Sequence, residues 1–396
     1  MSDQLTLSDL AFLQSDVGQV LLADLAQADL SDRNQLRLLT QLRQQVEGSQ
    51  AAIALTTARL RKKAEAKFGE AAAGMFFTQS ALEQASDPLV RAYRTRQIQG
   101  ERVLDVCCGI GSDTSAFAVA GYAAHGIDID PVRVAIARHN ADVLHSSATF
   151  EVADVTAGIP SGYDTVFFDP ARRDEQGRRI FDVAQYIPPL SLVRSWDVPQ
   201  MIVKLSPGVD IDQVRDYGGK LTFVSVQGDL KEAILQPGTD SQNYEAVFLT
   251  DADTLTWVHD TRVPQPEVQM GEPAGWLVEP DPAILRASLV RHLAAEIDAV
   301  MLDETIGYLT TDVHPQTPWA RCWRVLDWMP YHLKKLRSYL RAHDIGTVTV
   351  KKRGSPITPE QLIAALKLKK GTQERTLVLT RLRGEPIVMI CEPQPV

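Results

Sequence analysis

The chain has few cysteines and no long apolar run, and these two features restrict the classes of protein to which it can belong. Its 396 residues include only four cysteines, and none stands at the paired spacing of a metal site, so we expect no metal. Free cysteines usually pack as small buried hydrophobes, and they fit a reducing compartment. No apolar stretch approaches the length of a membrane span, and the first residues lack the regions of a signal peptide. These features predict a cytoplasmic protein without a membrane partner.

Positive charge is scarce in most of the chain and concentrated near its end. The chain has 41 Lys and Arg against 50 Asp and Glu, a net charge of −9. Residues 332–396 hold 13 basic and five acidic residues, a balance of +8, which leaves −17 for residues 1–331. A basic module on an acidic body can bind a polyanion locally. The alternative is a set of scattered, solvated lysines, because Lys-rich helix faces are common.

A missing glycine separates two classes of cofactor site. An apolar run from Val103 leads into a turn with Gly109 and Gly111, but Thr114 stands where a dinucleotide-binding loop has its third glycine. Asp105 lies inside the run, where its carboxylate would repel a diphosphate and pair with the cationic amine of a methionine moiety. A Gly-x-Gly turn alone is often only a strand-to-helix connection, so the assignment needs further support.

Three more short apolar runs end in acidic turns, and their spacing is that of successive strands in one parallel sheet. The carboxyl ends of such strands open onto a single crevice. Asp128, followed by Ile129, ends the second run and is placed to accept both ribose hydroxyls, and Asp154 ends the third and is placed to accept from an adenine amine. Asp130 is more simply the cap of a helix that starts at Pro131. Together the turns predict S-adenosylmethionine as the cofactor.

These motifs resemble a known family. The stretch 103–179 is similar to the core of class I S-adenosylmethionine-dependent methyltransferases and, within that class, to the trimethylguanosine synthases, which are RNA guanine-N2 methyltransferases. The motifs Met75–Ala85 and Phe168–Arg173 and the basic C-terminal part resemble a prokaryotic group of such enzymes that ends in a THUMP-like domain and acts on poorly defined RNA. The residues that carry the core resemblance are 108–111, 126–131 and 136–141.

The resemblance also implies a lid. In the resembling enzymes a segment just before the first strand closes over the cofactor, which makes Phe76, Phe77 and Thr78 lid candidates, with Phe77 and Thr78 expected to contact the cofactor. The alternative is that Phe76 and Phe77 are a pair of core phenylalanines. Downstream, Ser80 and Glu83 have the spacing of a capping box, and Asp87 before Pro88 predicts the start of a further helix.

The fourth turn, Phe167–Arg173, carries the predicted catalytic residues. Enzymes that methylate an exocyclic amine often have Asn/Asp/Ser-Pro-Pro-aromatic at this strand end, and Asp169 and Pro170 fit the first two positions. Their oxygens would accept hydrogen bonds from the amine and aim its lone pair at the methyl group. Arg172 replaces the aromatic residue on which a flipped base would stack, so a methylated cap is doubtful as substrate. Arg172 and Arg173 are predicted to orient the substrate, because guanidinium groups stack on bases and bind phosphates. The alternative for Arg172 is a pair with an internal carboxylate.

The chain as a whole is predicted to have an α/β fold, with a Rossmann-like seven-stranded methyltransferase core, an N-terminal helical domain and a small C-terminal α+β domain. The helical domain is predicted to have a leucine core that includes Leu21, Leu36, Leu38 and Leu42. The last three core strands are expected at 200–205, 221–226 and 244–249. The predicted domains are 1–70 (helical), 71–320 (methyltransferase, with a lid or bridge at 71–100) and 325–396 (THUMP-like).

We therefore expect an S-adenosylmethionine-dependent methyltransferase that acts on a nitrogen of an RNA base, with guanine N2 as the first choice and tRNA or rRNA as the partner. Lys351, Lys352 and Arg353, at the end of a predicted strand, are expected to contact the RNA. Lys204, Lys231 and Glu232 would line the pocket or form structural ion pairs. Two alternatives stay open: a catalytically inactive RNA-binding or scaffold protein that keeps the fold, and a methyltransferase for a protein or small molecule.

Overall fold

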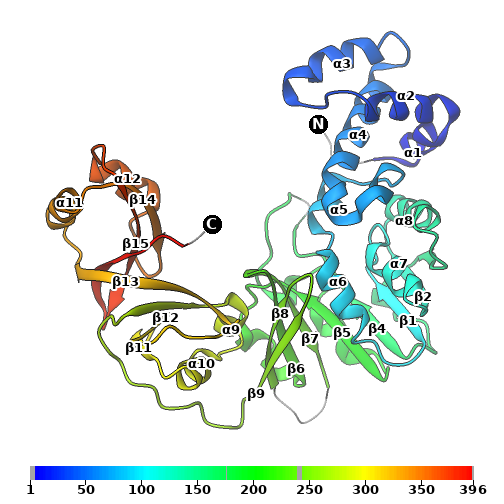
Figure 1. Cartoon of the computed structure of the whole chain (residues 1–396). Coiled ribbons are helices and arrows are strands. Elements are labelled where there is room, and N and C mark those ends of the chain that lie inside the picture. The colour runs from blue at the N-terminus through cyan, green and yellow to red at the C-terminus, as the bar shows by residue number, and fades with distance from the viewer. Residues whose placement is uncertain (1–4, 175, 239–242, 395–396) are drawn as a thin grey trace. The chain divides into compact units, whose positions relative to one another are not determined.

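The chain forms two units in the computed structural model, which describes residues 5–174, 176–238 and 243–394 (Figure 1). The first unit comprises Met1–Val226, Lys231–Ser241 and Leu249–Asp253, and the second comprises Gln227–Leu230, Gln242–Phe248 and Thr254–Val396. Among the described residues, no helix is long and apolar enough to cross a membrane.

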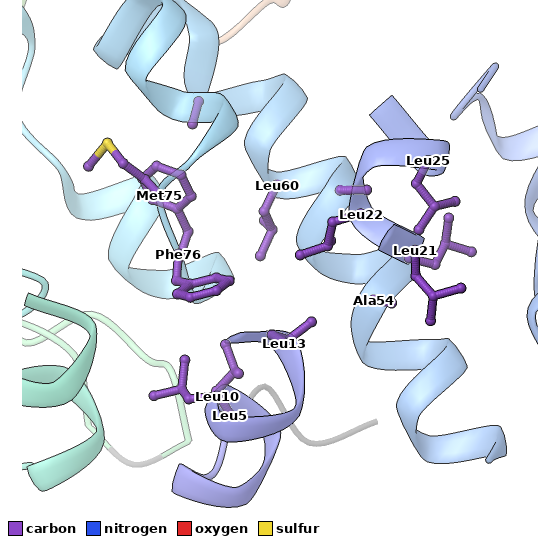
Figure 2. Packing of buried hydrophobic residues seen from close by; sticks show 14 of the residues in the cluster. Leu5, Leu10, Leu13, Leu21, Leu22, Leu25, Ala54, Leu60, Met75 and Phe76 are labelled. Carbon is purple, nitrogen blue, oxygen red and sulfur yellow. The ribbon is translucent and has the colours of Figure 1, made fainter. Parts of the chain in front are cut away.

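Four helices open the first unit, as the apolar periodicity predicts. Thr6 and Ser15 cap two of them by accepting hydrogen bonds from backbone N–H groups three residues later. The prediction for Leu36 is wrong: it is 76% exposed, because it lies two residues from buried Leu38 and therefore on the opposite face of its helix. The other leucines pack into a cluster that also holds Leu60 and Phe76 (Figure 2). The helices are α1 (Leu7–Gln14), α2 (Asp16–Ala26), α3 (Gln35–Leu42) and α4 (Gly48–Phe68).

Two short helices, α5 (Gln79–Gln84) and α6 (Pro88–Thr95), connect this cluster to the sheet. The predicted capping box at Ser80 is wrong, because Thr78 is the N-cap of α5 and accepts from the N–H of Ala81 at 3.1 Å. The predicted cap at Asp87 is confirmed: its carboxylate accepts from Leu89 N–H at 2.9 Å, and Pro88 is the first helical residue.

A twisted sheet forms the rest of the first unit, and its strand ends position the candidate site. Seven of its strands lie in the order β3-β2-β1-β4-β5-β7-β6. Neighbouring strands from β3 to β5 are parallel, whereas β7 runs antiparallel to β5. The strands are β1 (Arg102–Val106), β2 (Ala123–Asp128), β3 (Thr149–Val152), β4 (Thr165–Phe168), β5 (Gln200–Leu205), β6 (Lys220–Val226) and β7 (Asp229–Gln236). This arrangement confirms the Rossmann-like class of the core.

The seventh strand of this sheet is not the predicted one. The chain reverses after β6 through Gln227 and Gly228, both with positive φ (51° and 90°), so β7 follows at once as the second strand of a hairpin. The predicted strand at 244–249 exists as β8 (Asn243–Leu249), which falls mostly in the second unit. Lys231 and Glu232 consequently lie within β7.

Helices α7 (Ser112–Val119) and α8 (Pro131–Val143) lie beside the first strands of the sheet (Figure 1). Asp130 caps α8 by accepting from Val132 N–H at 2.8 Å, as predicted. The backbone groups of Phe76 are held by Asn140 of α8, whose side chain accepts from Phe76 N–H at 2.8 Å and donates to Phe76 O at 3.0 Å. The segment before α5 is therefore fixed to the core of the unit.

The second unit is built on a seven-stranded sheet in the order β11-β12-β10-β13-β16-β15-β14. From β13 to β15 strands and helices alternate, as expected for the predicted small α+β domain, and a further strand, β16, follows. The predicted domain boundaries stay predictions, although β13 pairs with both β10 and β16, so this sheet continues across residue 325. Helices α11 and α12 pack on β14.

The strands of this sheet are β10 (Trp276–Pro280), β11 (Val300–Asp303), β12 (Ile306–Thr311), β13 (Ala320–Pro330), β14 (Ile345–Lys352), β15 (Gln373–Leu382) and β16 (Glu385–Cys391). Two further strands, β8 and β9 (Thr254–Asp260), are not part of it. The helices of the second unit are α9 (Pro282–Arg286), α10 (Val290–Glu296), α11 (Leu333–Ala342) and α12 (Pro359–Leu366).

Candidate active site and basic pocket

The turn after β1 leaves space for a ligand beside its first glycine. Gly109 and Gly111 both have positive φ (57° and 75°). A side chain at Gly111 would clash, because its Cβ would lie 2.8 Å from ring atoms of Phe150. At Gly109, by contrast, nothing lies within 4 Å of the Cβ position. The conformation of the turn therefore requires glycine at both positions, and packing forbids a side chain only at the second.

Asp128 fits the predicted ribose site. Its Oδ2 accepts from Gly109 N–H at 2.9 Å, and its Oδ1 accepts from Asp130 N–H at 3.0 Å. Each carboxylate oxygen keeps a second lone pair that a hydroxyl can use. Ile129 is 67% exposed beside it, an apolar surface of the kind on which a base packs. Asp154 is exposed, and its Oδ1 accepts from Thr156. These residues fit an adenosine moiety, and their contacts with it stay predictions.

Asp105 is buried at the end of β1, with 1% of its surface exposed. The hydroxyl of Thr114 donates to its Oδ2 at 2.5 Å. Burial, and then the negative charge of Asp113, raise the pKa of Asp105 well above its usual value. A ligand cation beside Asp105 would relieve this unfavourable charge, as expected for an aminoacyl moiety.

A buried ionic cluster lies behind the strand ends, and the sequence did not predict it. Arg94 of α6 is fully buried, donates to Glu232 of β7 at 2.6 and 2.7 Å, and forms a further ion pair with Asp113 of α7. Burial alone would lower the pKa of Arg94, but the two carboxylates outweigh it and raise that pKa. Glu232 thus forms a structural ion pair, which was one of the two predicted roles. Its only sequence signal is a carboxylate inside an apolar strand.

Asp169 follows β4 and faces Lys204 of β5. The Nζ of Lys204 lies 2.6 Å from Asp169 Oδ2, so Lys204 reaches the predicted catalytic residue. Pro170 is buried directly after it. Arg172 is half-buried, and no described carboxylate pairs with it. Arg173 donates to Gly177 O at 3.0 Å within its own loop. The catalytic and orienting roles of these residues stay predictions.

The lid candidates are well anchored. Phe77 is buried with its ring centroid 5.4 Å from that of Phe68, and Thr78 caps α5. The carbonyl end of α5 is bound by two ammonium groups: Lys67 donates to Leu82 O at 2.9 Å and to Ala85 O at 2.6 Å, and Lys204 lies 3.4 Å from Gln84 O. The packing of Phe77 matches the core alternative, while its contact with a cofactor stays a prediction.

The predicted RNA cluster of the second unit is partly engaged inside that unit. Lys351 donates to Glu279 at 2.7 Å and lies 4.2 Å from the centre of the Trp323 ring. The guanidinium of Arg353 lies 5.2 Å from the centre of the ring of Tyr308. Lys352 is exposed. The three side chains thus do not form one cationic surface, and their contacts with RNA stay predictions.

A second basic cluster lines a pocket of about 290 Å³ in this unit. It lies between the end of α11, the start of β14 and the segment after α12. Its acidic residue, Asp344, already accepts from Thr372 at 2.6 Å. Within the described part of the chain, the pocket's lysines form no ion pair, so their charge is available to an anion. The basic residues, called here the basic pocket, are Arg337, Arg341, Lys367, Lys369 and Lys370.

The two cysteines of the first unit lie in the turn after β1. Burial raises the pKa of both Cys107 and Cys108 well above the usual value. Among the described residues, no group of three or more His, Cys, Asp and Glu is arranged to hold a metal ion.

Three family models match different parts of the chain. A methyltransferase domain matches residues 98–211, a THUMP domain-like model matches residues 320–393, and a domain of unknown function matches residues 6–64. The first match contains every predicted cofactor residue from Asp105 to Asp154. The second contains the whole basic pocket.

Similar proteins agree with these matches. A Porphyromonas gingivalis W83 protein, a candidate methyltransferase, has the same fold: the TM-score is 0.74 at 18% identity, covering 92% of this chain and 99% of that one. A tRNA (uracil(54)-C(5))-methyltransferase of Pyrococcus abyssi is 33% identical over 75 residues, 19% of this chain and 18% of its own length. An uncharacterized S-adenosylmethionine-dependent methyltransferase of Mycobacterium tuberculosis is 34% identical over 359 residues, 87% of this chain and 98% of that protein. The chain therefore belongs to the S-adenosylmethionine-dependent methyltransferases, with a C-terminal THUMP-like domain.

Proposed function

We propose that this methyltransferase methylates a nitrogen atom of an RNA base. The observation that carries the proposal is the open carboxylate oxygen of Asp169, at the end of β4 and on the same edge of the sheet as the cofactor residues. Among the described residues, only the Oδ2 of this side chain is engaged, by Lys204. The side chain of Asp169 is 25% exposed, so Oδ1 is available to a substrate N–H.

The residues at the ends of β1 to β3 would hold the cofactor. Asp128 binds the ribose hydroxyls, Ile129 and Asp154 contact the adenine, Gly109 leaves the space between them open, and Asp105 faces the cationic amine. S-adenosylmethionine supplies a methyl group that is already electrophilic, so the enzyme needs mainly to align the acceptor. Alignment alone lowers a barrier by several kcal/mol, about 7 or more in favourable cases.

Asp169 and the carbonyl of Pro170 would perform that alignment. Both oxygens accept hydrogen bonds from an exocyclic amine, which fixes the direction of the nitrogen lone pair. Asp169 would also take up the proton that the amine gives up. Arg172 and Arg173 follow on the same loop and would contact the base or the adjacent phosphate.

A nitrogen acceptor is favoured over a carbon acceptor. Methylation of a pyrimidine carbon generally begins with a thiolate that adds to the ring, and the thiolate is the reactive form of cysteine. Cys107 and Cys108 are the cysteines of the first unit, and burial raises their pKa values, which disfavours the thiolate. Among nitrogens, guanine N2 is our first choice because of the resemblance of the core sequence.

RNA is favoured as the substrate by the second unit. Phosphates bind to Lys and Arg whose charge is not already paired. The basic pocket, of about 290 Å³, offers Lys367, Lys369 and Lys370 without an ion pair among the described residues, although Asp344 also lines it. The local similarity to RNA methyltransferases points the same way, because the matched relatives include a tRNA methyltransferase and a 23S rRNA (uracil(747)-C(5))-methyltransferase of Pyrococcus horikoshii. We make no choice between tRNA and rRNA.

The experiment incubates the purified chain with S-adenosylmethionine carrying a tritiated methyl group and with total RNA from cells that lack the gene. Mass spectrometry of the digested nucleosides then identifies the methylated atom. Label on a base nitrogen is expected, and Asp169→Ala is expected to lower the rate on the order of a hundredfold while binding S-adenosylhomocysteine as tightly as the parent.

Three other outcomes contradict the proposal. Label on a base carbon removes the nitrogen acceptor. Label only on added cell protein or small molecules transfers the activity to a different substrate class. Binding of RNA and cofactor with no transfer to any fraction identifies an inactive binding protein.

A further inference from the structure

We infer that Lys204 is the positioning residue for Asp169: it holds one carboxylate oxygen so that the other faces the acceptor nitrogen. This inference rests on the proposed function, because it assigns a partner to the residue that aligns the acceptor. The sequence alone allowed two roles for Lys204, lining the pocket or forming a structural ion pair, and the inference assigns it a third.

The sheet register places the two residues side by side. Strands β4 and β5 are parallel, and Phe168 pairs with Val203 at the last step of their shared ladder. The next residues along the two strands are Asp169 and Lys204. The contact between Nζ and Oδ2, 2.6 Å, is in the short range typical of charge-assisted hydrogen bonds. Lys204 therefore lies beside Asp169 on the neighbouring strand, and among the described residues it engages one of the two carboxylate oxygens.

The difference in burial supports a positioning role. The side chain of Lys204 is 5% exposed, whereas that of Asp169 is 25% exposed. An ammonium buried in an apolar strand, between Val203 and Leu205, is costly unless its partners are well placed. A pair kept only for stability gains little from exposing its carboxylate to solvent. An exposed carboxylate held by a buried cation is instead the arrangement expected when that carboxylate must receive a ligand in a fixed orientation.

Lys204 also connects Asp169 to the segment before the sheet. Its Nζ lies 3.4 Å from Gln84 O, at the carbonyl end of α5. The backbone of this segment is fixed at its other end by Thr78, which caps α5. One ammonium thus ties together the lid candidate and the acceptor-binding residue.

The chain offers a matched control for this connection. Lys67 also donates to the carbonyl end of α5, to Leu82 O and Ala85 O, but it makes no contact with Asp169. Lys67→Met removes a contact with α5 and leaves the Asp169 carboxylate unchanged. Lys204→Met removes a contact with α5 and also the hydrogen bond to Asp169. A difference between these variants reports on the contacts that Lys204 makes beyond α5, which are the hydrogen bond to Asp169 and the charge that lowers the pKa of Asp113. Lys204→Arg keeps the charge and a donor and should restore part of the function.

The experiment measures kcat and KM with the RNA fraction that the full-length chain methylates, together with affinity for S-adenosylhomocysteine. Lys204→Met is expected to lower kcat at least about thirtyfold, with KM for S-adenosylmethionine and the affinity for S-adenosylhomocysteine within about twofold of the parent. Lys67→Met is expected to keep kcat within a few-fold, and Lys204→Arg to fall between. Adding Lys204→Met to Asp169→Ala should cause little further loss, because residues that act as a unit are not additive.

A second measurement does not need RNA. In crystal structures with S-adenosylhomocysteine, Asp169 should change its side-chain rotamer in Lys204→Met and keep it in Lys67→Met. Three results would each overturn the inference: an unchanged Asp169 rotamer in Lys204→Met, equal kcat losses in Lys204→Met and Lys67→Met, or additive kcat losses when Lys204→Met is combined with Asp169→Ala. Absence of RNA methylation by the parent chain removes the proposed function instead, and the rotamer comparison then decides the inference by itself.

Discussion

Replacing Arg94 with Met should destabilise the first unit more than any exposed charge change. The guanidinium is fully buried and is shared by Glu232, whose side chain is 3% exposed, and Asp113, whose side chain is 11% exposed. Removing the cation deprives both buried carboxylates of the partner that they share. Breaking a buried pair in this way costs about 3 to 5 kcal/mol. For a unit of this size each kcal/mol shifts the melting temperature by roughly 2 to 4 °C, so a fall of roughly 6 to 20 °C is expected.

Differential scanning calorimetry measures this effect, with the transition of the first unit identified as the one that S-adenosylhomocysteine raises. Arg215→Met is the matched control, because Arg215 pairs with Asp212 at the surface, where both side chains are more than half exposed. Such pairs contribute about 1 kcal/mol or less. The deficit of Arg94→Met should shrink on acidification, since protonated carboxyl groups tolerate burial. A melting temperature within about 3 °C of the parent, or a deficit that grows at low pH, would refute the reasoning.

Three further changes test other parts of the site. Asp128→Ala should weaken S-adenosylhomocysteine binding at least about tenfold, because charge-assisted bonds to the ribose are lost; calorimetry with unchanged affinity would remove the ribose assignment. Asp105→Asn removes an acid whose pKa is raised above 3.8, mainly by burial. Native Asp105 retains its proton longer than the unfolded chain does, so the parent loses stability as pH rises from about 3.8 through the native pKa. The melting temperature of the variant relative to the parent should therefore increase with pH over that range, and a constant difference would contradict the assignment. The double variant Lys369→Ala, Lys370→Ala should reduce the slope of log RNA affinity against log salt concentration by about one for each lost phosphate contact. Identical slopes for parent and variant in filter binding would show that these lysines do not contact RNA.

Local signals in the sequence predicted much of the fold correctly. Asp87 and Asp130 precede prolines and cap the helices that follow, as the pattern indicates. These features depend on residues within a few positions of one another, so a single sequence contains all the information they need. The acidic turns at 105, 128, 154 and 169 were placed on one sheet edge for a related reason: parallel strands deliver their carboxyl ends to the same side.

Features that depend on long-range contacts were decided only by the tertiary structure. The strand β7 was missed because its existence depends on a tight turn at Gln227 and Gly228 and on pairing with β5. The sequence did not decide the role of Lys204, because only the register of β4 and β5 brings its side chain to Asp169.

Ion pairs between residues far apart in the sequence also cannot be predicted from the sequence alone. Arg94 and Glu232 are 138 residues apart, and Lys351 and Glu279 are 72 residues apart. A basic run such as 351–353 therefore looks like one surface in the sequence. In the folded chain, Lys351 pairs with a distant carboxylate, and Lys369 and Lys370 keep their charge available. Composition determined that the C-terminal part is basic; only packing decided which of its cations remain free to bind an anion, because a carboxylate brought close by folding neutralises a lysine that sequence alone leaves exposed.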